Sequence, residues 1–374
     1  MRFSLAIIAI CLVGFPVISA QSTATGQGAV FGHVYCADTR TPCRFADVKI
    51  QRVQKNFHAK KTGSNALELD ENSYSAVTGL DGGFLISGVS PGDYYIHSSF
   101  PGYLDPFQIV FSEVQGEDTI PLESLEKALP RITVSSGLTA NSDLTLSRGA
   151  ALGGTVRYDD AGPAETVNIV LYRKDKTGKW NRYGDSLFAG YRMSSSFRTD
   201  DRGRFYLPGL APGSYIVEAS LPQPHFIPGI GTGLSLTGPD SLRVFNGNKY
   251  RLKDASAIEL KEGEDRSDID IDIPTNGLHM IQGFITSKPV GLPITKGTVD
   301  LLDRDDKTVL READIQQDGS FGFKYVVNGT YLVQVAARAD GGEVQYDSQT
   351  APLLVDGDIA GLTYSVSTTK LSTP

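Results

Sequence analysis

The sequence predicts an all-β protein built from three tandem Greek-key β-sandwiches. Apolar runs are short, and turn residues separate them often, including 40 glycines among 374 residues. No long stretch shows the 3.6-residue apolar periodicity of a helix, which favours an all-β architecture. A pattern of four residue types also occurs three times, at intervals of 121 and 116 residues. A period of this length indicates tandem domains rather than a solenoid of short repeats.

The repeated pattern consists of a glycine, a phenylalanine two residues later, a second glycine ten residues after the first, and a tyrosine two residues beyond it. Its members are Gly82, Phe84, Gly92 and Tyr94, then Gly203, Phe205, Gly213 and Tyr215, then Gly319, Phe321, Gly329 and Tyr331. The first glycine ends a turn that needs positive φ. The phenylalanine and the tyrosine each open an alternating strand, so we expect a hairpin with one buried face. We expect the three tyrosines to be buried, with their hydroxyls bonded to backbone. A phosphate-binding loop would need a helix after the glycines, and no helical pattern follows.

Each copy opens with a glycine-containing strand, continues with a variable loop and a second strand, and closes on two strands joined by a polar turn. About seven strands per copy are therefore expected. The expected domains are residues 28–147, 148–275 and 276–368. No linker rich in Pro, Ser or Gly separates them, which favours a stiff rod. Insertions at residues 54–75 and 173–197 distinguish the first two domains, and sandwich loops are where function is usually placed.

The N-terminus predicts export. Residues 1–20 contain one Arg, an apolar run from Leu5 to Val17 and a small-residue end, which is typical of a secretory signal peptide cleaved after Ala20. Cys11 lies inside the apolar run, which argues against lipoprotein attachment. No later apolar run is long enough to cross a membrane. The mature chain is therefore expected in the periplasm, at the outer surface or outside the cell.

Two cysteines remain after cleavage, Cys36 and Cys43. An exported chain meets an oxidising compartment, so we expect a local disulfide. The alternative, a two-cysteine metal site, lacks a second pair of ligands. Cleavage also removes one basic residue, Arg2, and leaves 34 Lys and Arg against 43 Asp and Glu. A chain this acidic, without a basic stripe, is a poor candidate for binding nucleic acid or an anionic membrane.

Two motifs point to a family. The first, Thr-x-x-x-Gly-x-Phe, occurs at residues 78–84 and 199–205; the second, Gly-x-x-Pro-Gly-x-Tyr, occurs at residues 88–94 and 209–215; Phe-Pro-Gly-Tyr follows at residues 100–103. In these motifs the first two domains resemble the carboxypeptidase regulatory-like domain. The resemblance implies a transthyretin-like sandwich of the carbohydrate-binding-like fold group, which serves as an accessory module beside peptidases, outer-membrane receptors and surface proteins. The third domain departs from the pattern, with Ile315 in place of the Thr and Asn328 in place of the Pro. Fold alone does not fix function.

The chain shows no signature of an enzyme. None of its five histidines stands in a His-Glu-x-x-His motif, and there is no Gly-x-Ser-x-Gly elbow. A Ser-His-Asp triad need not be contiguous in sequence, so that alternative stays open. We expect a non-enzymatic protein without cofactor or metal. Asp268, Asp270 and Asp272 would share one face of a strand, as solvated carboxylates or, alternatively, as calcium ligands. The acidic stretch at residues 303–306 is typical of a polar turn.

The insertion of the second domain is the candidate binding site. Its candidate glycan-binding residues are Trp180, Tyr183, Tyr191, Lys179 and Arg182. Exposed aromatic rings can stack on sugar rings, while Lys and Arg can hydrogen-bond the hydroxyls. The alternative is that these aromatics cover the core or a domain joint. A second aromatic set, Phe226, Phe245 and Tyr250, is expected to cover a sandwich edge.

Several functions remain in competition. The first is an exported, non-catalytic scaffold or adhesion protein. The second is a carbohydrate-binding protein that uses the aromatic loop of the second domain. The third is an accessory module of a peptidase or outer-membrane receptor system. The partner would accordingly be a glycan or a cell-surface protein. An exposed Trp180 would favour the second function, and a pocket that joins a histidine to a carboxylate would instead favour a hydrolase.

Overall fold

The computed structural model describes residues 26–53, 57–58, 73–113, 119–120, 122–183, 197–221, 223–227, 231–235, 241–288, 291–337, 345–346 and 350–369. The strands fall into three consecutive two-sheet sandwiches, each around its own apolar core. The predicted class, tandem β-sandwiches, is confirmed. The predicted signal peptide lies outside the described residues.

One sheet of each sandwich, called here the first-strand sheet, is built around that sandwich's first strand. In the first sandwich, β1 (Gly28–Cys36) pairs antiparallel with β5 (Gly83–Val89) and parallel with β9 (Thr139–Asn141) and β10 (Leu144–Leu146). In the second, β11 (Ala150–Tyr158) pairs with β15 (Arg204–Leu210), β21 (Asp265–Arg266) and β22 (Ile271–Ile273). In the third, β23 (Leu278–Lys288) pairs with β26 (Ser320–Val327) and β30 (Ile359–Thr369), and β28 (Gln345–Tyr346) extends β30.

The other sheet, called the second-strand sheet, has an equivalent central pair in all three sandwiches. Its order in the first sandwich is β4 (Ser73–Val77), β2 (Asp47–Arg52), β6 (Gly92–Ser99) and β8 (Arg131–Val134). In the second, β12 (Asn168–Lys174) and β16 (Gly213–Ser220) are flanked by β13 (Trp180–Tyr183), β14 (Phe197–Arg198), β19 (Arg243–Phe245) and β20 (Ile258–Leu260). In the third, the order is β25 (Val309–Asp314), β24 (Gly297–Asp303), β27 (Gly329–Ala337) and β29 (Thr350–Val355). Two small pairs, β3 (Phe57–His58) with β7 (Thr119–Ile120) and β17 (Gln223–Ile227) with β18 (Gly231–Ser235), complete the strands.

The predicted hairpin in the repeat is wrong in its pairing. The strands on either side of the Pro-Gly turn do not pair with each other: β5 pairs with β1, whereas β6 pairs with β2 and β8. The turn therefore carries the chain from one sheet to the other, and the second and third sandwiches do the same. Both strands bury one face in the same core, so their alternation looks the same as in a hairpin.

The glycines of the first strands are required because the last strand passes close to them. Gly32 pairs with Phe84, Gly154 with Phe205, and Gly283 with Phe321. A Cβ added at Gly154 would lie 1.8 Å from the carbonyl oxygen of Ile269, and one at Gly32 would lie 2.0 Å from that of Ser142. These positions therefore admit no side chain. The first glycine of the repeat has φ of 77°, 73° and 82° in the three copies, which is the left-handed region that favours glycine.

The repeated tyrosine ties each sandwich core to the turn before it. Its hydroxyl donates to the carbonyl oxygen four residues earlier at 2.7 Å in every copy: Tyr94 to Ser90, Tyr215 to Ala211, and Tyr331 to Val327. Tyr94 and Tyr215 are fully buried, whereas Tyr331 is partly exposed. The third copy therefore keeps the hydrogen bond while its ring is less well covered.

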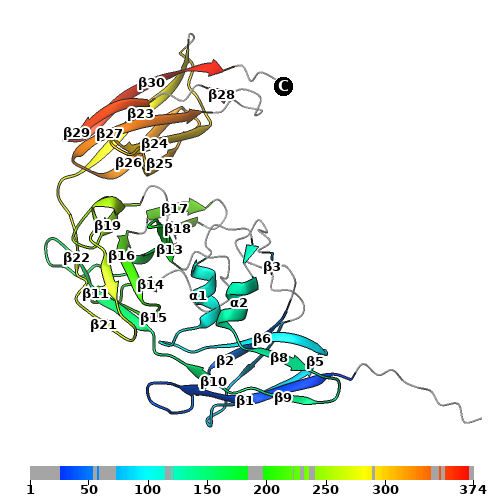
Figure 1. Cartoon of the computed structure of the whole chain (residues 1–374). Coiled ribbons are helices and arrows are strands. Elements are labelled where there is room, and N and C mark those ends of the chain that lie inside the picture. Colours follow the sequence, from blue (N-terminus) through cyan, green and yellow to red (C-terminus); the bar gives the residue numbers. More distant parts are fainter. Residues whose placement is uncertain are drawn as a thin grey trace, which may run out of the picture.

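The first sandwich carries two short helices that the sequence analysis missed, α1 (Pro106–Glu113) and α2 (Leu122–Ala128). The start of α1 has a recognisable signal: Asp105 Oδ1 accepts the Phe107 N–H at 2.9 Å, and proline occupies the first helical position. The helices cover the outer face of β6 (Figure 1) through a small cluster that contains Tyr95, Phe107, Val110, Leu125 and Leu129.

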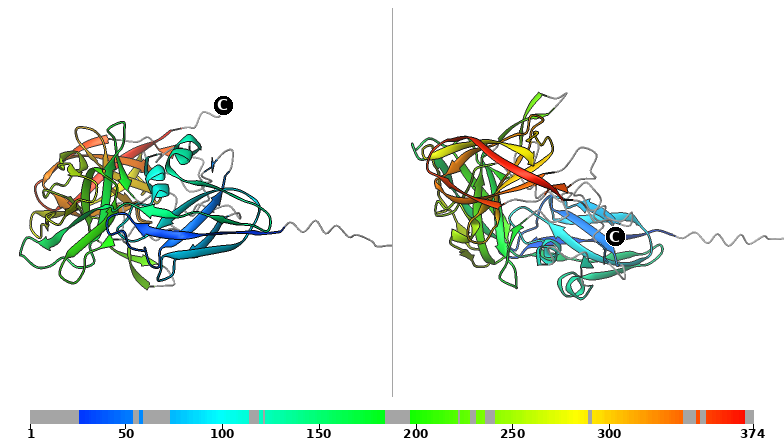
Figure 2. Two further views of the ribbon diagram at one scale, coloured as in Figure 1. Left: turned by 60° about the horizontal axis from the view of Figure 1, so that its bottom comes forward. Right: turned by 90° about the horizontal axis from the view of Figure 1, so that it is seen from above.

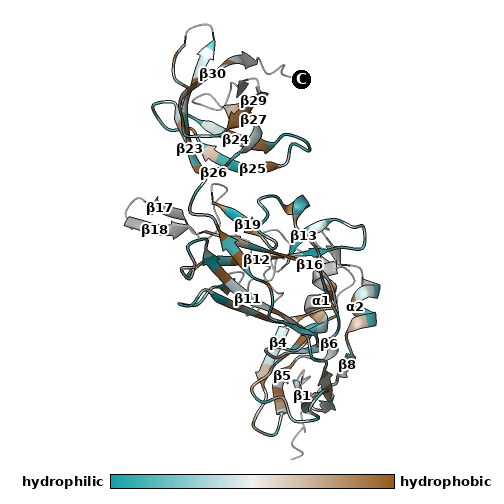
Figure 3. Ribbon diagram, turned by 90° about the vertical axis from the view of Figure 1, so that its left-hand side faces the viewer, coloured by the Kyte–Doolittle hydropathy of each residue, from teal (hydrophilic) through white to brown (hydrophobic). Residues whose placement is uncertain are grey.

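The sandwiches follow one another in a bent row rather than along a straight axis (Figure 1). Figure 2 shows the first sandwich set to one side of the second and third, and Figure 3 shows the order of the three from another side. Only residues 147–149 and 274–277 separate the last strand of one sandwich from the first strand of the next.

The predicted disulfide is confirmed: Cys36 and Cys43 are bonded, with their Cα atoms 5.6 Å apart, and they close the loop after β1.

Candidate functional site: the joints between the sandwiches

The predicted aromatic residues belong mainly to β13, which pairs with the end of β12. Trp180 is partly exposed and packs on the outer face of the second-strand sheet, beside the cluster of Tyr172 and Phe245. Lys174 Nζ lies 5.6 Å from the centroid of the Trp180 ring. Tyr183 packs instead against the inner core, edge-on to Tyr215 with ring centroids 5.8 Å apart.

Trp180 and Tyr183 therefore do not form one exposed surface on which a sugar ring could stack. Residues 180 and 183 lie on opposite faces because side chains alternate along a strand. Lys179 is exposed and Arg182 is partly buried, while Tyr191 lies outside the described residues. Within the described part of the insertion, the arrangement matches the alternative interpretation, in which the aromatics cover the sandwich.

The turn before β13 is organised by Asp175. Its Oδ1 accepts the Thr177 hydroxyl at 2.6 Å and the backbone N–H groups of Thr177 and Lys179 at 2.8 and 2.9 Å. The hydroxyl of Thr177 and then the N–H of Lys179 contribute most to lowering the pKa of Asp175 to about 2. The carboxylate thus stays ionised and holds the turn that starts β13.

The second aromatic set divides between two places. Phe245 is buried in the outer cluster of the second sandwich, and Tyr250 is 38% exposed beside the third sandwich. Phe226 lies in β17, and its side chain is outside the described set.

The alternating acidic residues each have a separate partner. Asp268 pairs with Arg266 at 2.6 Å, Asp270 accepts the Thr155 N–H at 3.1 Å, and Asp272 pairs with Arg157 at 2.8 Å. Two of them thereby fasten the last strand of the sandwich to β11. Among the described residues, no group of three or more potential ligands is arranged to hold a metal ion.

The Phe-Pro-Gly-Tyr motif forms the first joint. Gly102 O accepts the Gly149 N–H at 3.0 Å, and the Arg148 guanidinium lies 5.1 Å from the centroid of the Tyr103 ring. A Cβ at Gly149 would lie 2.5 Å from the Cα of Gly209, in the second sandwich. The tyrosine hydroxyl donates to Asp38 at 2.9 Å. The motif thus seats the second sandwich directly against the first.

The second joint is built on Asp303, which the sequence analysis assigned to a polar turn. Its side chain is only 2% exposed. Lys253 Nζ of the second sandwich lies 2.8 Å from Oδ1, and Arg251 of the second sandwich lies 3.0 Å from Oδ2. Burial by itself raises the pKa of Asp303, but hydrogen bonds, from Lys253 first, outweigh burial and lower it. The predicted polar turn is present at residues 304–306, where Asp303 Oδ1 also accepts the Asp305 N–H at 2.8 Å. What the turn prediction did not include is the ion pair that the same carboxylate makes between sandwiches.

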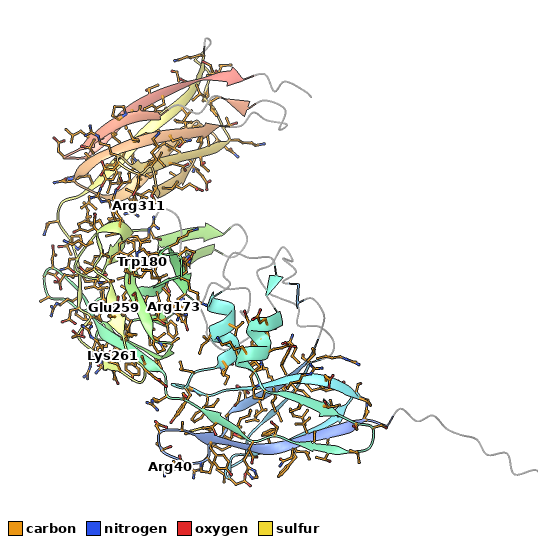
Figure 4. All side chains as sticks on the ribbon, viewed as in Figure 1. Arg40, Arg173, Trp180, Glu259, Lys261 and Arg311 are labelled. Atoms are coloured by element: carbon orange, nitrogen blue, oxygen red, sulfur yellow. A yellow bond between two sulfur atoms is a disulfide. The ribbon has the colours of Figure 1, made fainter. Side chains whose placement is uncertain are left out.

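A cavity of about 430 Å³ lies beside this ion pair, between the second and third sandwiches. Its lining includes Arg243, Tyr250 and Arg251 from the second sandwich and Arg311 and Tyr331 from the third. Figure 4 shows Arg311 at the end of the third sandwich that faces the second. Arg243 donates across the joint to the carbonyl oxygen of Leu310. Arg243 and Arg251 at this cavity thus make contacts that fix one sandwich against the other.

A buried histidine and carboxylate occur under α1. His97 Nδ1 lies 3.1 Å from Asp105 Oδ1, and the two side chains are 1% and 2% exposed. The His97 ring stacks on Phe107 with centroids 4.5 Å apart. A substrate has no access to side chains this deeply buried, so the pair does not favour a hydrolase; it anchors the start of α1 to β6.

In the described part of the chain, no helix combines the length and the apolar character needed to cross a membrane.

No family model and no curated protein matches the chain. Among solved structures, the Streptococcal ancillary pilin is similar at 9% identity, with 91% of this chain and 98% of that one covered and a TM-score of 0.28. GBS52, the minor pilin of Streptococcus agalactiae, is similar at 13% identity, with 60% and 98% covered and a TM-score of 0.24.

The Bacillus anthracis TIE protein is similar at 12% identity, with 92% of this chain covered and a TM-score of 0.23. The chain spans 51% of the length of that protein. With TM-scores this low, function has to be inferred from the contacts within the chain itself.

Proposed function

We propose that this chain is an exported, non-catalytic scaffold or adhesion protein whose three sandwiches are held at fixed relative orientations. The observation that carries the proposal is the second joint, where the buried carboxylate of Asp303 receives Lys253 and Arg251 from the neighbouring sandwich. Domains of one chain move relative to each other unless their interface opposes it. A desolvated carboxylate opposes such motion, because separating it from its cations would leave a buried charge unpaired.

The first joint supports the same function by a different contact. There the backbone of Gly209 packs on the first sandwich, so that a Cβ at Gly209 would lie 3.4 Å from the carbonyl oxygen of Tyr103, and Arg148 lies over the Tyr103 ring. Close backbone packing of this kind limits rotation about the short connection. Two fixed joints would let surfaces on different sandwiches be presented in one arrangement, as a scaffold or an adhesion protein requires.

We propose further that the first two sandwiches are carboxypeptidase regulatory-like domains and that the third is a divergent copy. The first glycine of the Gly-x-x-Pro-Gly-x-Tyr motif adopts the same left-handed conformation in both sandwiches. Gly88 has φ of 74° and Gly209 has φ of 80°. In the third, Tyr325 occupies the equivalent position at φ 57°, where a bulky side chain is strained. An accessory role beside a peptidase or a receptor is the alternative function that this assignment supports.

Fixed orientation is tested by distance measurements between spin labels. Labels at Lys261→Cys in the second sandwich and Thr363→Cys in the third, both exposed positions, should give one narrow distance distribution in the mature chain. The same labels combined with Asp303→Ala should give a broad one, because the joint loses its central carboxylate. A broad distribution in the parent protein would reject the fixed-scaffold proposal.

A further inference from the structure

The outer face of the second sandwich's first-strand sheet contains a hollow of about 400 Å³. Its base is formed by Gly153, Gly154 and Thr155 of β11, and its sides by Arg204, Tyr206 and Ser267. We call it the Tyr206 hollow. It lies on the opposite side of the sandwich core from Trp180, because Trp180 belongs to the other sheet.

Comparison of the three sandwiches shows what distinguishes this part of the sheet in the second. Tyr206 pairs across the strands with Gly153; the equivalent pairs are Phe31 with Leu85 in the first sandwich and Gln282 with Gly322 in the third. The position of Gly153 thus carries a large side chain in both other sandwiches. The missing side chain at Gly153 leaves room for the ring of Tyr206, its partner across the strands.

The Tyr206 ring is both fixed and accessible. A Cβ at Gly153 would lie 3.1 Å from ring atom Cδ2, so the ring leans across the glycine. Its hydroxyl donates to Asp265 Oδ2 at 2.9 Å, which anchors the far end of the side chain. The residue nevertheless remains 49% exposed. An anchored ring loses little conformational freedom when a ligand packs on it.

The side chain of Arg204 is also held in place, by Asp200, and the equivalent positions of the other two sandwiches carry no such pair. Asp200 Oδ2 accepts Arg204 Nε at 2.9 Å and also lies 2.8 Å from its NH2, while Asp200 Oδ1 accepts the backbone N–H groups of Arg202 and Arg204. The equivalent pairs of positions are Gly79 with Gly83 in the first sandwich and Gln316 with Ser320 in the third. The guanidinium is therefore held at the edge of the hollow with its charge balanced by Asp200.

We propose that the Tyr206 hollow binds one pyranose ring of a neutral oligosaccharide. The apolar C–H face of the sugar would pack on Tyr206, and its hydroxyls would bond to Arg204, Thr155 and Ser267. A charged ligand gains little net attraction, because Asp200 balances Arg204. A purely apolar ligand would desolvate polar side chains without replacing their hydrogen bonds. A sugar ring satisfies both requirements, and the volume is within the usual range of small-molecule sites.

This site goes beyond the scaffold proposal and is independent of it, because it lies within one sandwich. The test is calorimetric titration of the mature chain with maltohexaose, cellohexaose, xylohexaose, laminarihexaose and chitohexaose. At least one should bind. Tyr206→Leu, which introduces the residue of the first sandwich, should then weaken binding roughly tenfold or more, the scale of an interface hot spot. Tyr206→Phe keeps the ring and should change affinity by less than about threefold.

Two further variants keep the test decisive. Arg204→Ser introduces the residue of the third sandwich and should also weaken binding, by roughly tenfold through loss of charged hydrogen bonds. Leu85→Ala, at the equivalent position of the first sandwich, is the matched control and should leave binding unchanged. Melting curves establish that each variant is folded. The absence of binding to all five probes, or equal affinity of the parent and a folded Tyr206→Leu or Arg204→Ser variant, would overturn the proposal.

Discussion

Lys253 of the second sandwich lies with its Nζ 2.8 Å from Oδ1 of Asp303 in the third, a carboxylate whose side chain is 2% exposed. Fifty residues of sequence separate the two. Arg251 contacts the other oxygen of the same carboxylate. One buried carboxylate thus joins the two sandwiches, together with the bond that Arg243 donates to the carbonyl oxygen of Leu310.

Replacing Asp303 with Asn should loosen this joint. The amide keeps the volume of the carboxylate but loses its charge, so the hydrogen bonds from the two cations weaken. We expect a loss of about 1.5–3 kcal/mol in unfolding free energy, the range for hydrogen bonds to charged groups. Urea denaturation measures it. Asp305→Asn is the control, because Asp305 is 71% exposed and should change stability little; equal effects of the two variants would contradict the assignment.

The contribution of Asp303 should also depend on pH. Hydrogen bonds hold the pKa of its carboxyl below the ordinary value, which is about 3.9 in an unfolded chain. A depressed folded pKa gives stability that is present above the unfolded pKa and lost as pH falls through the folded one. The stability difference between the parent and Asp303→Asn should therefore be constant near neutral pH and shrink below about pH 4. A difference that persists undiminished to about pH 2 would contradict this.

Truncation of the repeated tyrosine should lower the free energy of unfolding by different amounts in the three sandwiches. Tyr94→Ala and Tyr215→Ala should each lower the unfolding free energy by about 3–5 kcal/mol, the range for buried aromatic residues. Tyr331→Ala should cost less, because that ring is partly exposed. The corresponding Tyr→Phe changes remove only a hydroxyl bond to backbone, worth about 0.5–1.5 kcal/mol. Thermal and chemical unfolding of the six variants measures the order, and a Tyr331→Ala effect as large as that of Tyr215→Ala would be inconsistent with it.

Gly154→Ala should disrupt the first-strand sheet of the second sandwich. The new Cβ would lie 1.8 Å from the carbonyl oxygen of Ile269, so the backbone of one strand has to move. Overpacking of this kind costs about 1–3 kcal/mol or more. Gly357→Ala is the matched control, since a Cβ there meets nothing within 4 Å. Equal melting temperatures for Gly154→Ala and the parent protein would show that the two strands do not approach each other so closely.

Trp180→Ala should destabilise the second sandwich. Its ring covers the outer cluster that contains Tyr172 and Phe245, so truncation exposes apolar surface. Because the ring is only partly buried, we expect roughly 1–3 kcal/mol, less than for a fully buried tryptophan. Lys179→Ala, at an exposed neighbouring position, is the control. Unchanged stability together with loss of binding to an oligosaccharide would restore the insertion as a glycan site.

Much of the fold could be predicted from local rules. The spacing of Gly82, Phe84, Gly92 and Tyr94 reflects one turn with positive φ and two alternating strands, and these properties depend on residues close in sequence. The same spacing recurs in the second and third copies, which is why the three sandwiches were predictable. The pairing of Cys36 with Cys43 follows from the predicted export and from the absence of other cysteines after the predicted cleavage site.

Other features had signals that the sequence analysis did not use. Asp105 followed by Pro106 is a typical signal for the start of a helix. The two helices have only eight and seven residues, however, which is too short for a clear apolar periodicity. Trp180 and Tyr183 are close in sequence, which predicts one aromatic group. Once residues 180–183 form a strand, the odd separation puts the two rings on opposite faces.

The sequence by itself thus determined the number of sandwiches, their turns and the alternation of their strands, because each depends on the conformations open to a few consecutive residues. Only the tertiary structure decided which sheet each strand joins: β5 and β6 bury the same kind of face in either arrangement. It also decided that Asp303 faces Lys253 rather than water, and that Gly153 leaves a hollow beside Tyr206. These are contacts between segments distant in sequence, and their strength depends on burial, which no local pattern specifies.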